Sequence, residues 1–329
     1  MALIVNPLNS KSVSDFTPQE LDLILEFTCT NLSLSQPETR SKVLSILGIA
    51  LSCVKKRLYQ NYREACKARK FPQKNPDAIN TLEASIQVKF EFLRKFTALL
   101  VNSIAPCLPY RSVLSALTLL KDLVILFGVE AIPTDENHYA QGFPFSISSF
   151  LLTPRVVMRL ISGLTSRFSN LQQLSFEILS QFPAADKITR ATGIDIQTFL
   201  TDFAHARLKS VKAADADSAA WLFKYVLHIS KPTSRISFLE SILDLLDSRL
   251  ALSRTDLAMA CQEYPIHGVV RVLVVALKAT DRTYGSEAYQ RAYAKIREVC
   301  AVFLDLLTDE SPGTRAHFKI HSTSSSHLF

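Results

Sequence analysis

The sequence predicts an all-α fold, an α-solenoid of about a dozen helices, and three observations lead to this prediction. Apolar residues recur with helical periodicity from end to end, and prolines separate the periodic segments. Only eight glycines occur, and the one β-branched segment, VVRVLVVAL, has neighbours that favour a buried helix. The 329 residues also exceed the size of one compact core, roughly 50–200 residues, so the chain should form either two domains or an extended repeat, and its composition favours the repeat.

The first two helices are predicted from capping signals and periodicity. Thr17-Pro18-Gln19-Glu20 has the form of a capping box with proline at the first helical position, so a helix runs from residue 18 to about 32. A second helix begins at Pro37 and ends at Phe71-Pro72. Its apolar residues fall within about 60° of arc at 100° per residue and predict the buried face: Val43, Leu47, Val54, Leu58 and Ala65.

The following helices are predicted from Thr81 to about Ser103 and from Tyr110 to Phe127. The loop of roughly twenty residues after them, 128–148, has a length typical of mobile or functional loops. Thr153-Pro154 then begins a helix, and Ser169 is predicted to cap its partner, which ends at Pro183. Two helices of about 13 residues joined by a tight turn form the repeating unit of an α-solenoid.

Helical patterns continue to Thr308 and define one helical-repeat domain over residues 16–308, with the loop 128–148 as the place for an internal division. After Thr308 the sequence loses its periodicity and becomes rich in serine. Residues 309–329 are therefore predicted to be a disordered tail or an artefact of the gene model.

No residue pattern points to catalysis. The seven histidines lack metal-ligand spacing, and neither a nucleophile elbow nor a glycine-rich phosphate loop occurs, so the chain is predicted to be no enzyme and to hold no metal or cofactor. The six cysteines include no C-x-x-C pair, which indicates reduced thiols in the cytoplasm. No apolar run is long and clean enough for a transmembrane segment.

One segment, KKRLYQNYREACKARKFPQK, holds the whole charge excess of the chain. Its eight basic residues and one acid give +7, and the complete sequence, with 37 Lys plus Arg against 30 Asp plus Glu, also sums to +7. A positive field confined to twenty residues attracts phosphates. The candidate phosphate contacts are these eight residues: Lys55, Lys56, Arg57, Arg63, Lys67, Arg69, Lys70 and Lys74.

Helical geometry groups four of these cations. With Val54 at 0°, Lys56, Arg63, Lys67 and Lys70 fall between about 160° and 220°, opposite the predicted buried face. We name these four residues the basic ridge. Three interpretations stay open: contact with phosphates, contact with an acidic protein, and an ordinary solvated helix face.

A second basic helix is a secondary candidate for stacking on RNA bases, with an ordinary amphipathic surface as the alternative. Its tyrosines interleave with cations: Tyr284, Tyr289 and Tyr293 alternate with Arg282, Arg291, Lys295 and Arg297.

Three segments in order resemble the THADA-like family. The helix, N-x-x-x-x-x-P-x-x-R turn and long basic helix match at Asn31, Pro37 and Arg40, and a repeat pair ends in Phe182-Pro183. The third segment is an amphipathic helix leading to D-L-x-x-A and a Pro-x-x-Gly turn, matched by Asp256, Leu257, Ala260, Pro265 and Gly268. The resemblance covers residues 16–280.

The resemblance implies a HEAT/armadillo-like solenoid that holds tRNA and an FtsJ-like tRNA 2′-O-methyltransferase together during methylation of the anticodon loop. The chain would then be a cytoplasmic, non-catalytic scaffold, with the basic ridge on tRNA phosphates. The rival interpretation is a protein-only scaffold without a role in RNA, for which a membrane surface is one candidate location.

Two departures from the family pattern stand out. Gln172 occupies a position in the second helix of the Phe-Pro pair where members commonly carry arginine, so no role of that arginine is carried over. Members of the family are also far longer, so the chain is expected to be a fragment or a truncated gene model.

Overall fold

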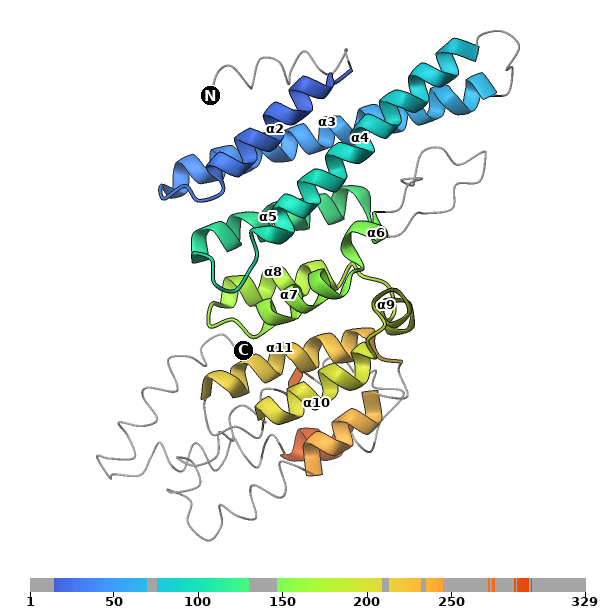
Figure 1. Cartoon of the computed structure of the whole chain (residues 1–329). Coiled ribbons are helices and arrows are strands. Elements are labelled where there is room, and N and C mark those ends of the chain that lie inside the picture. Colours follow the sequence, from blue (N-terminus) through green and yellow to red (C-terminus); the bar gives the residue numbers. More distant parts are fainter. Residues whose placement is uncertain are drawn as a thin grey trace. The chain divides into compact units, whose positions relative to one another are not determined.

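The computed structural model describes residues 15–69, 76–129, 147–208, 213–231 and 235–244, and a few residues between 272 and 297 (Figure 1). The chain divides into two compact units, Met1–Ile194 and Asp195–Phe329, and each is described by itself. Every regular element in the described ranges is a helix, and several pairs of consecutive helices pack against each other: α2/α3, α3/α4, α4/α5, α7/α8 and α10/α11. The prediction of an all-α solenoid is therefore confirmed.

Helix α2 (Pro18–Asn31) begins with the predicted capping box. Thr17 Oγ1 accepts a hydrogen bond from the Glu20 backbone N–H at 3.3 Å, and Glu20 Oε2 accepts one from the Thr17 backbone N–H at 2.9 Å. Both bonds satisfy N–H groups that have no partner within the helix. The start of α2 is therefore fixed by its own sequence.

Helices α3 (Pro37–Arg69) and α4 (Pro76–Asn102) form the long hairpin of the first unit (Figure 1). The predicted buried face of α3 is confirmed, since all five of its apolar residues are buried: Val43, Leu47, Val54, Leu58 and Ala65. Helix α4 begins five residues before the predicted Thr81, because Pro76 suits the first helical position and Asp77 complements the helix dipole. Phe71 and Pro72 lie outside the described residues.

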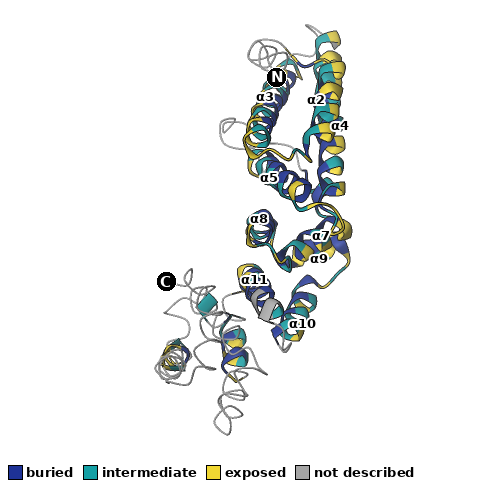
Figure 2. Cartoon of the chain, turned by 90° about the vertical axis from the view of Figure 1, so that its left-hand side faces the viewer, coloured by how far each residue is buried: buried dark blue, intermediate teal, exposed yellow. Residues whose placement is uncertain are grey.

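Helix α5 (Tyr110–Phe127) is the core helix of this unit, and it packs against α3, α4 and α8 (Ser169–Leu179). Figure 2 shows buried residues where these helices face one another and exposed residues on their outer sides. The predicted loop after α5 ends at the short helix α6 (Ser148–Leu151), and its residues 130–146 lie outside the described part.

Helix α7 (Pro154–Leu164) pairs with α8 to form a shorter hairpin. Thr153 caps α7 as predicted, with its side chain accepting from the Val156 N–H. The prediction that Ser169 caps α8 is wrong, because Ser169 is the first helical residue and its hydroxyl donates to Asn170 Oδ1. A Cβ at Gly163 would lie 2.0 Å from Ser175 Oγ, so the absence of a side chain at this glycine lets α7 and α8 approach closely.

Helix α9 (Ala185–Thr192) closes the first unit and was not predicted. Its last turn ends at Gly193, which adopts the left-handed conformation with φ 72° and ψ 8°. Glycine takes this conformation without the steric cost that a Cβ imposes. The buried residues of α9 keep helical spacing (Ala185, Ile188 and Thr192), so a short periodic signal accompanies the glycine in the sequence.

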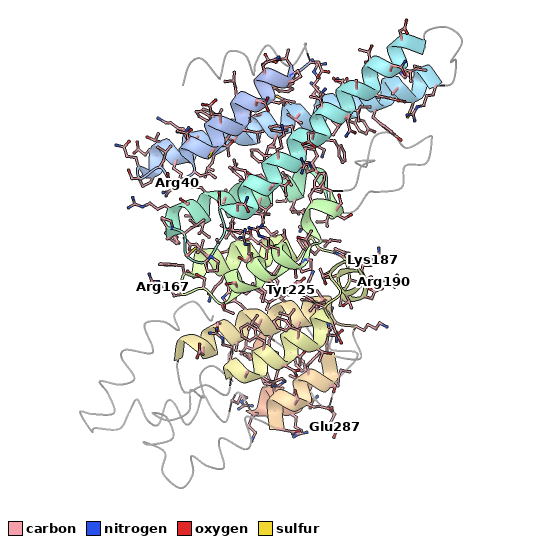
Figure 3. All side chains as sticks on the ribbon, in the orientation of Figure 1. Arg40, Arg167, Lys187, Arg190, Tyr225 and Glu287 are labelled. Carbon is pink, nitrogen blue, oxygen red and sulfur yellow. The ribbon has the colours of Figure 1, made fainter. Side chains whose placement is uncertain are left out.

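The second unit contains the packed pair α10 (Ile196–Leu208) and α11 (Ala213–Ile229), followed by helical residues 235–244. Tyr225 of α11 is fully buried, and its hydroxyl has no hydrogen-bond partner among the described residues. Burial raises the pKa of Tyr225. Figure 3 labels this side chain.

Candidate nucleic-acid interface

The structure places three residues of the basic ridge on the outer side of α3. Lys56, Arg63 and Lys67 are exposed, whereas Val54 and Leu58 of the opposite side are completely buried. Lys56 and Lys67 form no ion pair with a described residue, and eleven residues of α-helix between them correspond to about 16 Å. Lys70, the fourth member, lies outside the described residues, as does the candidate Lys74.

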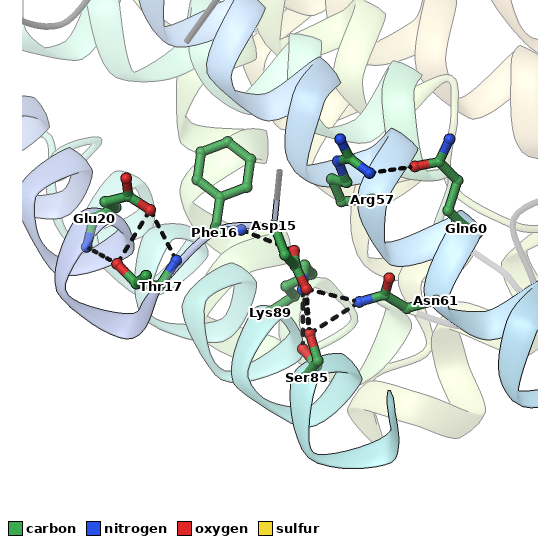
Figure 4. Close-up of polar contacts among 9 residues, drawn as sticks. All are labelled: Asp15, Phe16, Thr17, Glu20, Arg57, Gln60, Asn61, Ser85 and Lys89. Carbon is green, nitrogen blue, oxygen red and sulfur yellow. Dashed lines mark hydrogen bonds and ion pairs between the residues drawn. The ribbon is translucent and has the colours of Figure 1, made fainter. Parts of the chain in front are cut away.

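The candidates Lys55 and Arg57 flank the ridge and are half-buried. Arg57 Nη1 donates a hydrogen bond of 3.0 Å to Gln60 Oε1, one turn further along α3 (Figure 4). Its guanidinium is therefore oriented along the helix surface, and part of its hydrogen-bonding capacity is used within α3.

The charge of Arg69 is compensated by an acid from α4. Its Nη2 and Nε lie 2.6 and 3.2 Å from Glu83 Oε1. The hydrogen bond and charge of Glu83 raise the pKa of Arg69. Both side chains are about half exposed, so the pair is worth little to stability but reduces the positive field at this end of α3. Sequence reasoning missed Glu83, which lies fourteen residues away.

A partly buried polar cluster, in which Asn61 and Lys89 are buried and Asp15 is exposed, fixes the orientation of α3 behind the ridge (Figure 4). The Lys89 ammonium of α4, which is almost completely buried, lies 2.7 Å from Asp15 Oδ1. Asp15 Oδ2 also accepts from Ser85 Oγ at 2.6 Å and from Asn61 Nδ2 of α3 at 3.0 Å. The cluster thus joins α3, α4 and the segment before α2.

The charges in this cluster depend on one another. Partial burial alone would raise the pKa of Asp15, but the hydrogen bonds from Lys89, Ser85 and Asn61 outweigh it and lower that pKa to about 2. Burial lowers the pKa of Lys89, against the effect of Asp15. One feature of the sequence indicates this cluster: Asn61 occupies a position of α3 where the helical pattern predicts an apolar residue.

The family-motif residues near the first turns have structural contacts. Asn31 Nδ2 donates to the Phe27 carbonyl at 2.7 Å, and Arg40 Nη1 donates to the Leu34 carbonyl at 3.3 Å. Figure 3 shows Arg40 at the turn between α2 and α3, where Pro37 begins α3. These residues stabilise the turn by satisfying carbonyl groups at its two sides.

Gln172 lies in α8, and the Phe-Pro pair follows the end of this helix. Phe182 is buried and Pro183 is half-buried. Gln172 is also buried, and its Nε2 donates to the Ser166 carbonyl at 2.7 Å, across the turn from α7. In this chain the glutamine therefore holds the turn between α7 and α8.

Five residues of the third family motif lie outside the described residues: Asp256, Leu257, Ala260, Pro265 and Gly268. Part of the secondary tyrosine-bearing helix is described. Tyr293 is exposed, and Arg291 Nη2 lies 3.5 Å from Asp244 Oδ1. This ion pair offsets one of the cations that were considered for RNA.

In the described ranges, no group of three or more His, Cys, Asp or Glu side chains is arranged to hold a metal ion. Over the same ranges, no helix has the length and apolar character needed to cross a membrane. The four described cysteines are free thiols: Cys29, Cys53, Cys66 and Cys107.

Comparison with known proteins gives one match. The model of a family described as "Trm732, TPR repeats" matches residues 2–173, just over half of the 329-residue chain. The match includes α2 to α5, α7, the basic ridge and the polar cluster behind it. No curated protein and no solved structure matches the chain.

Proposed function

Because this chain belongs to the Trm732, TPR repeats family, which is linked to tRNA modification, we propose that it is a non-catalytic scaffold for tRNA methylation. The scaffold holds tRNA and helps an FtsJ-like methyltransferase to modify a 2′-hydroxyl in the anticodon loop. The catalytic residues and the S-adenosylmethionine site belong to that partner. Both proteins would act in the cytoplasm. The helical repeats of the scaffold would be of the HEAT/armadillo-like type.

The exposed side of α3 is the observation that carries the RNA part of this proposal. Lys56, Arg63 and Lys67 share this side, and Glu64 is the one acid exposed beside them on this stretch of α3. Basic side chains on one rigid helix position a nucleic acid through its phosphates without reading its sequence. The polar cluster of Asp15, Asn61 and Lys89 supports the proposal because it fixes this helix on its neighbours.

The test measures tRNA affinity of the full chain at several salt concentrations. The triple variant Lys56→Gln/Arg63→Gln/Lys67→Gln is expected to bind tRNA more weakly. The slope of log affinity against log salt should fall by roughly 2 to 3, since each lost phosphate contact removes about 0.7–0.9. Unchanged affinity and an unchanged slope would refute the assignment of RNA contacts to the ridge.

A matched control removes three exposed cations of the same unit that lie outside α3: Arg111→Gln/Arg167→Gln/Lys187→Gln. This variant has the same change in net charge, so a general electrostatic effect weakens both triple variants equally. The proposal expects the control to keep most of the tRNA affinity and the salt slope. A second control, Arg69→Gln, is expected to have a smaller effect than Lys67→Gln, because Glu83 already compensates Arg69.

The partner and the rival scaffold function need separate measurements. Co-purification with an FtsJ-like methyltransferase, and faster methylation of tRNA in the presence of the chain, are the expected results. A protein-only scaffold at a membrane surface instead predicts flotation with vesicles of anionic lipid and no gel shift of tRNA at the same salt concentration. Methyl transfer by the isolated chain would contradict a non-catalytic role.

A further inference from the structure

An open groove lies between α3 and α5 of the first unit, beside the basic ridge. Its volume is about 500 Å³. Nine residues line it: Ser45, Gly48, Ile49, Ser52, Cys53 and Lys56 of α3, and Asp122, Ile125 and Leu126 of α5. The floor on the α3 side consists of small residues, so the surface of α3 is recessed along this line.

Exposed aliphatic side chains occupy both walls of the groove. Ile49 of α3 is 50% exposed, and Ile125 of α5 is 59% exposed. Most large aliphatic residues of these two helices are buried instead. Water contact with two isoleucines on facing walls is unfavourable, at roughly 25 cal/mol for each Å² of apolar surface. A partner that covers both walls removes this cost.

The groove also contains a carboxylate with no described hydrogen-bond partner. Asp122 is half-buried, and its Oδ2 lies 3.8 Å from the position that a Cβ on Gly48 would occupy. The neighbouring Lys121 does not pair with it, because Lys121 Nζ lies 2.6 Å from Glu177 Oε2 of α8. Burial raises the pKa of Asp122, against the effect of Lys121. A hydrogen-bond donor supplied by a ligand would remove the free-energy cost of leaving this half-buried carboxylate without a partner.

The charges in the groove decide which partner fits. Lys56 is exposed and solvated, so it needs no counter-charge, whereas the half-buried Asp122 does. Polyanionic RNA is disfavoured in an apolar groove that holds a carboxylate. A protein segment with apolar residues and a basic side chain satisfies both the walls and Asp122. The groove between two adjacent helices suits an amphipathic helix, which presents such residues at three- and four-residue spacing.

We propose that the groove between α3 and α5 binds an amphipathic helix of a partner protein, with apolar side chains between Ile49 and Ile125 and a lysine or arginine paired with Asp122. The proposal extends the scaffold function above, from which it takes only that the chain has a protein partner. It assigns protein binding to the groove and phosphate binding to the adjacent ridge, and Lys56 is the one residue that belongs to both.

The first experiment places a photo-crosslinking amino acid at Ile125 of the full chain in cells and identifies the attached peptide by mass spectrometry. The expected product is a peptide of another protein that has an amphipathic helical pattern and a basic residue within about one turn of its apolar anchors. Crosslinks confined to RNA, to this chain itself or to a second copy of it would overturn the proposal.

The second experiment tests the charge pair with the identified partner. Asp122→Asn keeps the size of the side chain and is expected to lower the affinity about 10-fold. Asp122→Lys is expected to abolish binding, and exchange of the partner's basic residue for aspartate should restore it. Glu26→Lys, a change at an exposed acid of α2, is the matched control and should leave the affinity unchanged. Unchanged binding of both Asp122 variants would contradict the proposal.

Two readouts keep this proposal separate from the scaffold function. Circular dichroism establishes whether each variant is folded. If Asp122→Lys does not fold, the binding test uses Asp122→Asn alone. The tRNA affinity of Asp122→Asn should equal that of the unmodified chain. If the ridge variants leave tRNA binding intact while the groove still captures the basic helix, the RNA proposal fails and the groove proposal stands.

Discussion

The Lys89 ammonium of α4 lies 2.7 Å from the Asp15 carboxylate, although 74 residues separate the two in the sequence. Lys89 also donates to the Ser85 hydroxyl at 2.6 Å, so the buried charge has several partners. Because a buried ammonium is costly without a counter-ion, the segment that carries Asp15 is held against α4.

Asp15→Ala should lower the free energy of unfolding by about 2–3 kcal/mol, because it leaves the Lys89 ammonium buried without its counter-ion. The double variant Asp15→Ala/Lys89→Met should recover much of this loss, since methionine has a similar length and no charge. Urea denaturation followed by circular dichroism measures both. Equal stability of the single and double variants would show that the buried charge costs little.

The same carboxylate predicts a dependence of stability on pH. The pKa of Asp15 is about 2 in the folded chain and 3.8 ordinarily, so its contribution is complete above the ordinary value and is lost as the pH falls toward 2. The difference in unfolding free energy between the unmodified chain and Asp15→Asn should be constant above about pH 5 and should shrink between about pH 4 and 2. A difference that stays flat across this range would argue against the ion pair. Urea unfolding at a series of pH values provides the measurement.

Thr17→Ala should destabilise the first turn of α2 by about 1 kcal/mol, because the capping side chain is lost. Thr17→Ser keeps the hydroxyl and serves as the control. Hydrogen exchange of the amides in residues 19–21 localises the effect, and these amides should exchange about five-fold faster in the alanine variant. Equal exchange in the two variants would mean that packing, and not the cap, holds this turn.

Tyr225→Phe should leave the second unit as stable as before or stabilise it by about 1 kcal/mol, because the buried hydroxyl has no partner among the described residues. Tyr225→Ala, which removes the ring, should cost about 3–5 kcal/mol. Thermal unfolding of the two variants distinguishes these effects. A marked loss of stability in Tyr225→Phe would reveal a hydrogen bond to the hydroxyl.

Local signals in the sequence were enough for most of the fold. The cap at Thr17, the buried face of α3 and the bounds of α5 follow from short-range chemistry and helical periodicity. Helix α9 was missed although its buried residues keep helical spacing, because that spacing extends over only eight residues. The start of α4 was placed too late, since proline at the first helical position outweighed the later apolar pattern.

The candidate site was only partly accessible from the sequence. Periodicity alone predicted that Lys56, Arg63 and Lys67 lie opposite the core. The pairing of Arg69 with Glu83 and the approach of Asp15 to Lys89 join different elements, so they depend on tertiary packing that local patterns do not encode. The groove between α3 and α5 was missed for the same reason.

The close approach of α7 and α8 at Gly163 has a consequence for the evolution of the family. Because a Cβ at Gly163 would lie 2.0 Å from Ser175 Oγ, a homologue can acquire alanine at the first position only if it also loses the side chain at the second or shifts the helices apart. The two positions should therefore covary among related sequences, and the spacing of this helix pair should be inherited as one unit.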